Sequence, residues 1–381
     1  MAELDAERQR QAAEYGIKRR RLGVTSFIVG GIFIAVLLLS PLSNSIAGRL
    51  PDSPVLAAAL YFVLLMFAYD LVTLPLSYFS GLALPRHYGL SKQNVQGWLG
   101  DHYKSLSMGI VLGSIAVAVL YFLIQRWPEG WWLLAWAGLM VVSLVLTVLA
   151  PVLIIPLFFK MKPMQAGELK DRLEALVSRT GVTVGGIYII EFSEKTSQAN
   201  AAVMGLGKTK RVAISDTLIE QYSPEEIELV MAHELAHQRH GDVWRLFGFQ
   251  AGTFLIIFSL GSGIFDYLSG LMDYVNLTDP AALPLLLTSF FVASIPVLPL
   301  SGWFSRRLEM AADAYALKLT DNPQVFISAM TKLTDQNLSE ARSPSFFERL
   351  GQGHPSYTDR VRMAREFSEN STQNKLIGQD L

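Results

Sequence analysis

Two histidines and a glutamate lie within one five-residue stretch, His233-Glu234-Leu235-Ala236-His237. Histidines four residues apart share one face of an α-helix, so both rings can reach a single metal ion. Glu234 falls on the adjoining face, where its carboxylate can act through a water molecule as a general base. The stretch therefore predicts a metal site, and the alternative for so short a pattern is two histidines on a solvated helix.

The surrounding segment carries strong signals for a helix. Ser223 is followed by Pro224 and, three residues after the serine, by Glu226, which predicts an N-cap, a proline in the first turn and a capping box. The residues that lead into the motif, Val230 to Ala232, are uncharged, as are Leu235 and Ala236 inside it. This context favours a metal site over a solvated helix.

A catalytic zinc site needs a third protein ligand and one open position. The chain has no cysteine, so the ligands must be His, Asp or Glu. Glu309 is our candidate, and Asp313, one turn further along the same predicted helical face, is expected to accept the free ring N–H of a ligand histidine. The alternative is a solvated face on which both carboxylates pair with Arg306 and Arg307.

The composition indicates a membrane protein. Of the 381 residues, 51% are hydrophobic and 17% charged, which is too apolar for an ordinary soluble domain of this length. The net charge of -1, with both signs mixed along the chain, argues against nucleic acid as a partner. Six apolar stretches are long enough to cross a bilayer, near residues 24–47, 55–80, 104–125, 131–158, 246–270 and 281–303.

The basic residues predict the orientation of these spans. Lys and Arg concentrate in the N-terminal tail and in the loops on the same side of the membrane, which are therefore expected to be cytoplasmic. Two spans separate His237 from Glu309, and this even number returns the chain to the same side, as two ligands of one metal require. The first span is expected to stay as an anchor rather than to be cleaved as a signal peptide, because the charged lead-in is long and contains acidic residues.

Further stretches occur in an order that is known from one family. They are Leu74-Pro75-Leu76-Ser77-Tyr78, Ile155-Pro156-Leu157-Phe158, Gln198-Ala199-Asn200-Ala201, the His233 motif, Ser305-Arg306-Arg307-Leu308-Glu309 with Ala312-Asp313-Ala314, and His354-Pro355 followed by Arg360. In these the chain resembles, over most of its length, the integral-membrane CaaX prenyl protease family, to which a bacterial heat-shock membrane peptidase is related. Eukaryotic members have one more span near the N-terminus and a long charged insertion before the histidine motif, and this sequence shows neither.

The resemblance implies a zinc metalloendopeptidase with one zinc ion per chain. His233, His237 and Glu309 would be the ligands, inside a chamber walled by transmembrane helices. His354 and Arg360 would supply or orient a hydrogen-bond donor for the oxyanion that develops during peptide hydrolysis. Without the resemblance, His354 reads as a loop residue.

The apolar stretches, and the polar segment between the fourth and the fifth of them, give the expected organisation of the chain. The fold is a predominantly α-helical integral membrane protein, with about six transmembrane helices and a small α/β zinc-peptidase unit. The expected parts are a cytoplasmic N-terminal tail at 1–22, spans one to four at 23–160, the zinc-peptidase unit with the His233 helix at 161–245, spans five and six at 246–303, and the third-ligand helix with the C-terminal catalytic segment at 304–381. Within the peptidase unit we expect a helix near 167–180 and strands at 184–192, 199–204 and 211–215.

One of these strands is a candidate for substrate binding. Asn200 and Ala199 lie in the stretch that resembles the family's edge strand, to which the substrate backbone adds as a further strand. An ordinary strand of the small sheet is the alternative, and both can hold at once. Asp70, inside the second span, is expected to face protein or water, unless the end of that span is placed wrongly.

The expected partners are the lipid bilayer and a peptide or protein substrate, with or without an attached lipid. The lack of the eukaryotic insertion favours a bacterial member in the inner membrane, with its catalytic segment on the cytoplasmic side and a broader role such as quality control of membrane proteins. Two alternatives are a zinc-regulated transporter and an inactive peptidase-like scaffold. The absence of an inverted repeat argues against the first, and the retention of Glu234 argues against the second.

Overall fold

The structure is a computed structural model that describes residues 3–271 and 277–377. Within this part, six helical segments are long and apolar enough to cross a membrane. They span Ala6–Leu39, Pro54–His87, Val95–Arg126, Trp131–Phe158, Asp242–Leu271 and Pro280–Thr320. The predicted fold, mainly helical with six membrane spans and a small sheet, is confirmed.

Helices make up most of residues 3–160. They are α1 (Ala6–Leu39), α2 (Leu42–Ala47), α3 (Pro54–Tyr78), α4 (Leu84–His87), α5 (Val95–Arg126), α6 (Trp131–Leu149) and α7 (Ile155–Phe158), with π-helical segments η1 (Phe79–Ala83) and η2 (Ala150–Ile154) joining α3 to α4 and α6 to α7. The second of these widened turns contains Pro151, which has no N–H to continue the α-helical pattern. Arg211 donates to the carbonyl of Pro151 at 3.2 Å, which ties the end of the fourth span to the sheet.

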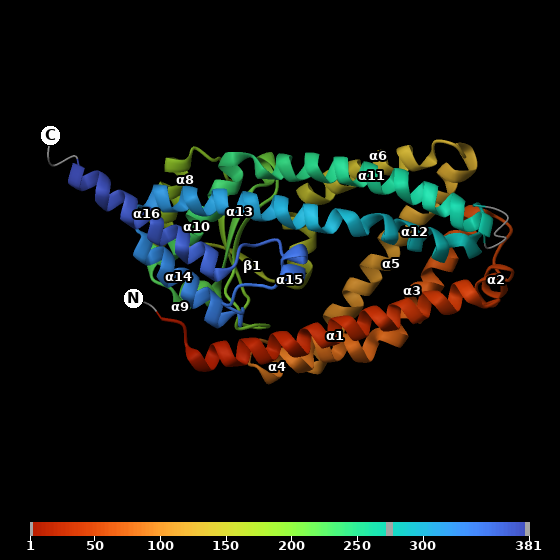
Figure 1. Cartoon of the computed structure of the whole chain (residues 1–381), viewed down its shortest axis with the longest axis horizontal. Helices are drawn as coiled ribbons and strands as arrows, with labels where there is room; N and C mark the ends of the chain where they lie inside the picture. Colours follow the sequence, from red (N-terminus) through yellow and green to blue (C-terminus); the bar gives the residue numbers. More distant parts are fainter. Residues whose placement is uncertain (1–2, 272–276, 378–381) are drawn as a thin grey trace.

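The first helix begins at Ala6, so the expected N-terminal tail is the first part of the same helix as the first span. The side chain of Asp5 accepts hydrogen bonds from the backbone N–H groups of Glu7 and Arg8, which caps this helix. Figure 1 shows α1 running from the bundle of long helices to the end of the molecule where α9 and α14 lie. The N-terminal helix therefore joins the membrane part to the peptidase unit.

A four-stranded sheet forms the centre of the peptidase unit. Its strands are β1 (Met161–Pro163), β2 (Ile187–Ile190), β3 (Ala201–Met204) and β4 (Arg211–Ser215), in the order β1-β2-β4-β3. β2 and β4 are parallel, and the two outer strands pair antiparallel to their neighbours. The three predicted strands are present, the first two shorter than expected, and β1 was not predicted. β3 lies at one edge of the sheet, so one side of its backbone has no strand partner among residues 3–271 and 277–377.

The remaining helices surround this sheet or continue into the membrane. They are α8 (Glu168–Thr180), α9 (Asp216–Gln221), α10 (Pro224–His240), α11 (Asp242–Leu271), α12 (Leu283–Ser294), α13 (Leu298–Thr320), α14 (Pro323–Gln336), α15 (Phe346–Gly351) and α16 (Tyr357–Ile377), with 3₁₀ turns η3 (Gly207–Thr209), η4 (Pro280–Ala282) and η5 (Ile295–Val297). In Figure 1, α13 continues from the membrane bundle into the peptidase unit, where α8, α10, α14 and α16 gather around the sheet.

Two apolar cores stabilise the two parts. In the peptidase unit, buried residues of α10 such as Leu229 and Leu235 pack with Ile214 of β4 and Phe326 of α14. A second core lies among the membrane helices and includes Tyr61, Tyr121 and Trp131. Because α10 is buried in the first core, the backbone that carries the histidine motif is held from several sides.

Candidate metal centre

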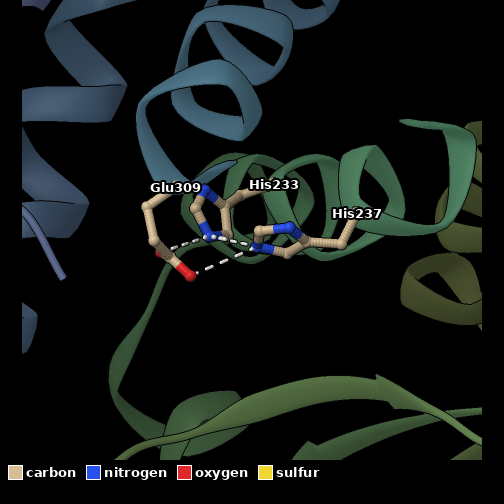
Figure 2. A group of neighbouring side chains, drawn as sticks. All are labelled: His233, His237 and Glu309. Carbon is tan, nitrogen blue, oxygen red and sulfur yellow. Dashed lines mark hydrogen bonds and ion pairs between the residues drawn. The ribbon is translucent and has the colours of Figure 1, made fainter. Parts of the chain in front are cut away.

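Three candidate ligands converge from two helices. His233 and His237 lie one turn apart on α10, and Glu309 lies on α13. The Nε2 atoms of the two histidines are 3.3 Å apart, and the two oxygens of Glu309 lie 3.4 Å from Nε2 of His233 and 3.5 Å from Nε2 of His237. Figure 2 shows the three side chains pointing toward one another.

These separations fit a small metal ion. Four ligands placed tetrahedrally around zinc, at bonds of about 2.0–2.1 Å, have donor atoms about 3.3–3.4 Å from each other. The three distances here are of that size, and two imidazoles with one carboxylate form a donor set that catalytic zinc sites use. The residues therefore suit a zinc ion, with room in the set for a water molecule or a substrate.

Helix capping sets the position of α10. The Ser223 side chain accepts from the N–H of Glu226, and the Glu226 side chain accepts from the N–H of Ser223, as the sequence predicts. At the other end, Gly241 adopts a left-handed conformation with φ of 68° and ends the helix directly after the motif. The two histidines therefore lie on a helix whose start and end are both defined by local sequence.

Each histidine has a carboxylate behind it. Nδ1 of His233 lies 2.8 Å from Asp313 Oδ1, and Nδ1 of His237 lies 2.9 Å from Asp242 Oδ2. Such partners fix the tautomer of a ligand histidine, so that Nε2 is free to bind metal. Asp313 lies where the sequence analysis expected a partner, whereas Asp242 was missed. Its signal was its place directly after Gly241, the turn that brings the first residue of α11 back toward the motif.

Arg360 lies behind Asp313. Its Nε donates to Asp313 Oδ2 at 2.7 Å, and its Nη2 donates to Oδ1 of the same carboxylate. The Asp313 side chain is fully buried, so this two-pronged pair compensates a charge that has no access to water. Arg360 is thus linked to the candidate ligand His233 through the Asp313 carboxylate.

Glu234, the candidate general base, lies between the helix and the edge of the sheet. Burial raises the pKa of its carboxyl above the ordinary value, against the opposing effect of His233 and His237. The backbone N–H of Val203 in β3 faces the same carboxylate and lowers its pKa, a smaller effect than that of burial. A raised pKa makes a carboxylate a better proton acceptor, which suits a general base.

His354 comes from the loop between α15 and α16. Its Nδ1 lies 2.9 Å from Glu309 Oε2, while 75% of the side chain is exposed. The hydrogen bond to Glu309 raises the pKa of His354. On the far side of the loop, Nη1 of Arg306 donates to the carbonyls of Arg349 at 2.7 Å and Gln352 at 2.5 Å. The loop that carries His354 is therefore fastened to α13, the helix of the third ligand candidate.

The two substrate-binding candidates lie just before β3. The backbone carbonyl of Asn200 accepts from the N–H of Ser215, so the backbone of this residue continues the pairing with β4. Ala199 instead exchanges two hydrogen bonds with the side chain of Asn337 on the opposite side. Asp70 in the second span pairs with Nε2 of His102 at 2.8 Å, so this carboxylate faces protein, as expected.

Comparison with known protein families gives two adjoining matches. Residues 1–160 match the family described as "CAAX prenyl protease N-terminal, five membrane helices", and residues 163–368 match "Peptidase family M48". Together the two matches cover nearly all of the chain. The second one contains all three candidate metal ligands and both of their carboxylate partners.

Two relatives and one solved structure resemble the chain over most of its length. The metalloprotease YhfN of Bacillus subtilis is 31% identical over 309 residues, covering 80% of this chain and 72% of that protein. CAAX prenyl protease 1 of Saccharomyces cerevisiae is 31% identical over 313 residues, covering 76% and 68%. The crystal structure of S. mikatae Ste24p superposes with a TM-score of 0.79 at 26% identity, covering 94% of this chain and 89% of that one. These matches are to proteases, and none supports the transporter alternative.

Proposed function

The chain belongs to peptidase family M48 and is a multi-pass membrane metalloprotease, and on this basis we propose that it is a zinc endopeptidase whose one zinc ion is held by His233, His237 and Glu309. The observation that carries the proposal is the mutual spacing of the three donor atoms, 3.3 to 3.5 Å, which is the spacing of a tetrahedral zinc site. Asp313 and Asp242 would keep the two histidines in the tautomer that presents Nε2 to the metal.

The other site residues have separate roles in peptide hydrolysis. Zinc, when bound, supplies a Lewis acid that polarises the scissile carbonyl and lowers the pKa of water to about 7. Glu234 takes a proton from the attacking water and passes it to the departing amine, a transfer for which its raised pKa is suited. His354, which lies beside Glu309 and is open to solvent, donates to the oxyanion. Arg360 acts at one remove, by holding Asp313 against His233.

The substrate is a peptide or protein at the membrane. β3 is an edge strand next to Glu234, with an unpaired backbone position at Ala201 among the described residues, and pairing with a strand edge binds the backbone of a peptide and tolerates different side chains. This supports a broad range of membrane-associated substrates, in which an attached lipid is not required. Limited quality-control proteolysis is the biological role that we propose for such an activity.

We also propose that the peptidase unit faces the cytoplasm of a bacterial cell, at the inner membrane. Lys18, Arg19, Arg20 and Arg21 precede the first apolar run, and positive charge favours the cytoplasmic side. Arg20 pairs with Glu340 at 2.5 Å, so the basic part of α1 and the C-terminal catalytic segment lie on the same side of the membrane. Protease protection of inverted and right-side-out vesicles would test this orientation.

The test of the proposed function compares purified wild type with Glu234→Gln, which keeps the size of the side chain but removes the base. We expect about one zinc per chain in both proteins, cleavage by wild type, and a loss of at least ~10²-fold in kcat for the variant. A farnesylated peptide and its unmodified twin, assayed side by side, measure whether lipid contributes. Glu225→Gln, on the exposed first turn of the same helix, is the matched control and should cleave as wild type. Wild type without zinc, or a fully active Glu234→Gln, would refute the proposal.

A further inference from the structure

The edge strand β3 presents only part of its backbone to a substrate. Hydrogen bonds of an antiparallel pair fall on alternate residues. Because the carbonyl of Asn200 accepts from Ser215 of β4, at 2.9 Å, the backbone groups of Ala199, Ala201 and Val203 point to the opposite, open side. These three residues form the row along which an extended peptide could pair.

At the start of this row, the pairing position is already filled. The backbone N–H of Ala199 donates to Asn337 Oδ1 at 3.0 Å, and Asn337 Nδ2 donates back to the carbonyl of Ala199 at 3.1 Å. This is the two-bond exchange that a paired strand residue would make. The amide of Asn337 therefore occupies the place that a substrate peptide group would need.

The other end of the row lies at the metal centre. The carbonyl of Val203 accepts from the Gln238 side chain of α10 at 3.2 Å, and its N–H lies near Glu234. Between these ends, the described residues provide no hydrogen bond to the outward N–H and carbonyl of Ala201. Ala201 is thus the unpaired position of the edge, two residues before Val203, whose N–H lies near Glu234.

Asn337 is held firmly in this place. It follows Gln336, whose Nε2 donates to the carbonyl of Ser197 at 2.8 Å and whose Oε1 accepts from Tyr222. It precedes Leu338, which is buried with Ala12 of α1 and Leu90. Because the residues on both sides of Asn337 are fixed, its backbone keeps this position when a peptide arrives.

We propose that Asn337 ends the substrate-binding edge, so that backbone pairing with the substrate takes place at Ala201 and stops before Ala199. Asn337 is then a specificity-determining residue that limits how much of the substrate, on one side of the scissile bond, contributes to binding. This proposal rests on the proposed function, in which Glu234 marks the position of the scissile bond.

The experiment uses two series of unmodified peptides that share one cleavage site and are lengthened by one residue at a time, on one side or on the other. For wild type, kcat/KM should rise as the peptide is lengthened on one side of the scissile bond, until the peptide includes the residue that pairs with Ala201. Further lengthening on that side should leave kcat/KM unchanged. In Asn337→Ala, which frees both backbone groups of Ala199, two further residues on that side should add about tenfold, the effect of two new hydrogen bonds. Mass spectrometry of the products confirms that the cleaved bond is the same.

Ser339→Ala is the matched control, because it changes an exposed residue two positions after Asn337 and leaves both hydrogen bonds between Asn337 and Ala199 in place. It should follow the wild-type length profile. A second measurement needs no variant: N-methylation of the substrate residue that pairs with Ala201 should cost about tenfold in kcat/KM for wild type, and N-methylation two residues further from the scissile bond should cost nothing.

The outcomes separate the two proposals. If wild type cleaves none of the peptides, or Glu234→Gln cleaves them as well as wild type does, the proposed function fails and the edge proposal with it. If cleavage depends on Glu234 but Asn337→Ala keeps the wild-type plateau, or Ser339→Ala shows the same gain, only the role of Asn337 is wrong. A loss on N-methylation at the further position in wild type contradicts that role as well.

Discussion

Glu309 has two histidine neighbours that could bind metal on one side and His354 on the other, and the two sides are held by different means. On the ligand side, His233 is 8% exposed, Asp313 is fully buried and Asp242 is 1% exposed. On the other side, 75% of the His354 side chain is exposed, and its loop is held by Arg306 and by the surface ion pair of Arg349 with Asp359, which bridges the loop.

Because of this difference, we expect that the metal site and the oxyanion donor can be changed independently of each other. A buried carboxylate that loses its partner leaves an uncompensated charge in the core, so changes behind the ligands should affect folding and metal binding together. Surface ion pairs contribute about 0–1 kcal/mol each, so changes around the His354 loop should affect the rate and leave the fold intact.

Removal of a ligand should have the largest effect. In Glu309→Ala we expect zinc content to fall well below one per chain and peptide cleavage to be lost, because two histidines alone leave the site a ligand short. Metal analysis and cleavage are measured together. Arg307→Ala, two residues away on the exposed face of α13, is the control and should keep both. A Glu309→Ala protein with full zinc content would show that another residue is the third ligand.

Removal of Arg360, the partner of Asp313, should have the second-largest effect. Arg360→Met leaves the Asp313 carboxylate buried without its guanidinium, which should lower the free energy of unfolding by about 3–5 kcal/mol. Thermal unfolding and zinc affinity are the measurements, and both should fall. Arg362→Met, on the exposed face of the same helix, should leave both unchanged. A variant that loses activity but keeps its thermal stability and zinc affinity would instead favour a direct role of Arg360 in catalysis.

His354→Ala should lower kcat by about 10²-fold, the usual effect of losing one oxyanion donor. Zinc content and thermal unfolding should match wild type, because the side chain is exposed and outside the core. If zinc binding falls with the rate, the two sides of Glu309 are coupled and the contrast between them is wrong.

The smallest effect is expected from removal of the Arg306 side chain, which attaches the His354 loop to α13. Arg306→Ala removes the donor to the carbonyls of Arg349 and Gln352 and should lower kcat by about tenfold through a less defined position of His354. The measurement is a double-mutant cycle. If Arg306 acts through His354, Arg306→Ala should have no further effect in a His354→Ala background. Additive losses in the double variant would assign Arg306 a separate role.

Much of the fold follows from local sequence patterns. The apolar lengths predicted the six spans, since a bilayer requires a nearly fixed number of helical residues. The capping residues Ser223 and Glu226 predicted the start of α10, and both hydrogen bonds are present. The short strand β1 was missed because three residues are too few to show a period.

The candidate site, too, was predicted in part from local sequence patterns and missed in part. Helical spacing placed His233 and His237 on one face, and an even number of spans brought Glu309 to the same side of the membrane. The partner of His237 was missed, because Asp242 belongs to the next helix and returns to the histidine only through the left-handed turn at Gly241. The role expected of Arg360 had come from a resemblance, which carries no information about which atoms the guanidinium contacts.

The sequence by itself determined the elements whose cause is local: the lengths of the spans, the ends of α10 and the shared face of its two histidines. Only the tertiary structure decided which side chains meet across long stretches of chain. Asn337 and Ala199 are 138 residues apart, and Arg306 and Gln352 are 46 apart. A hydrogen bond between such residues depends on how whole helices pack, and packing leaves no periodic signal in the sequence around either partner.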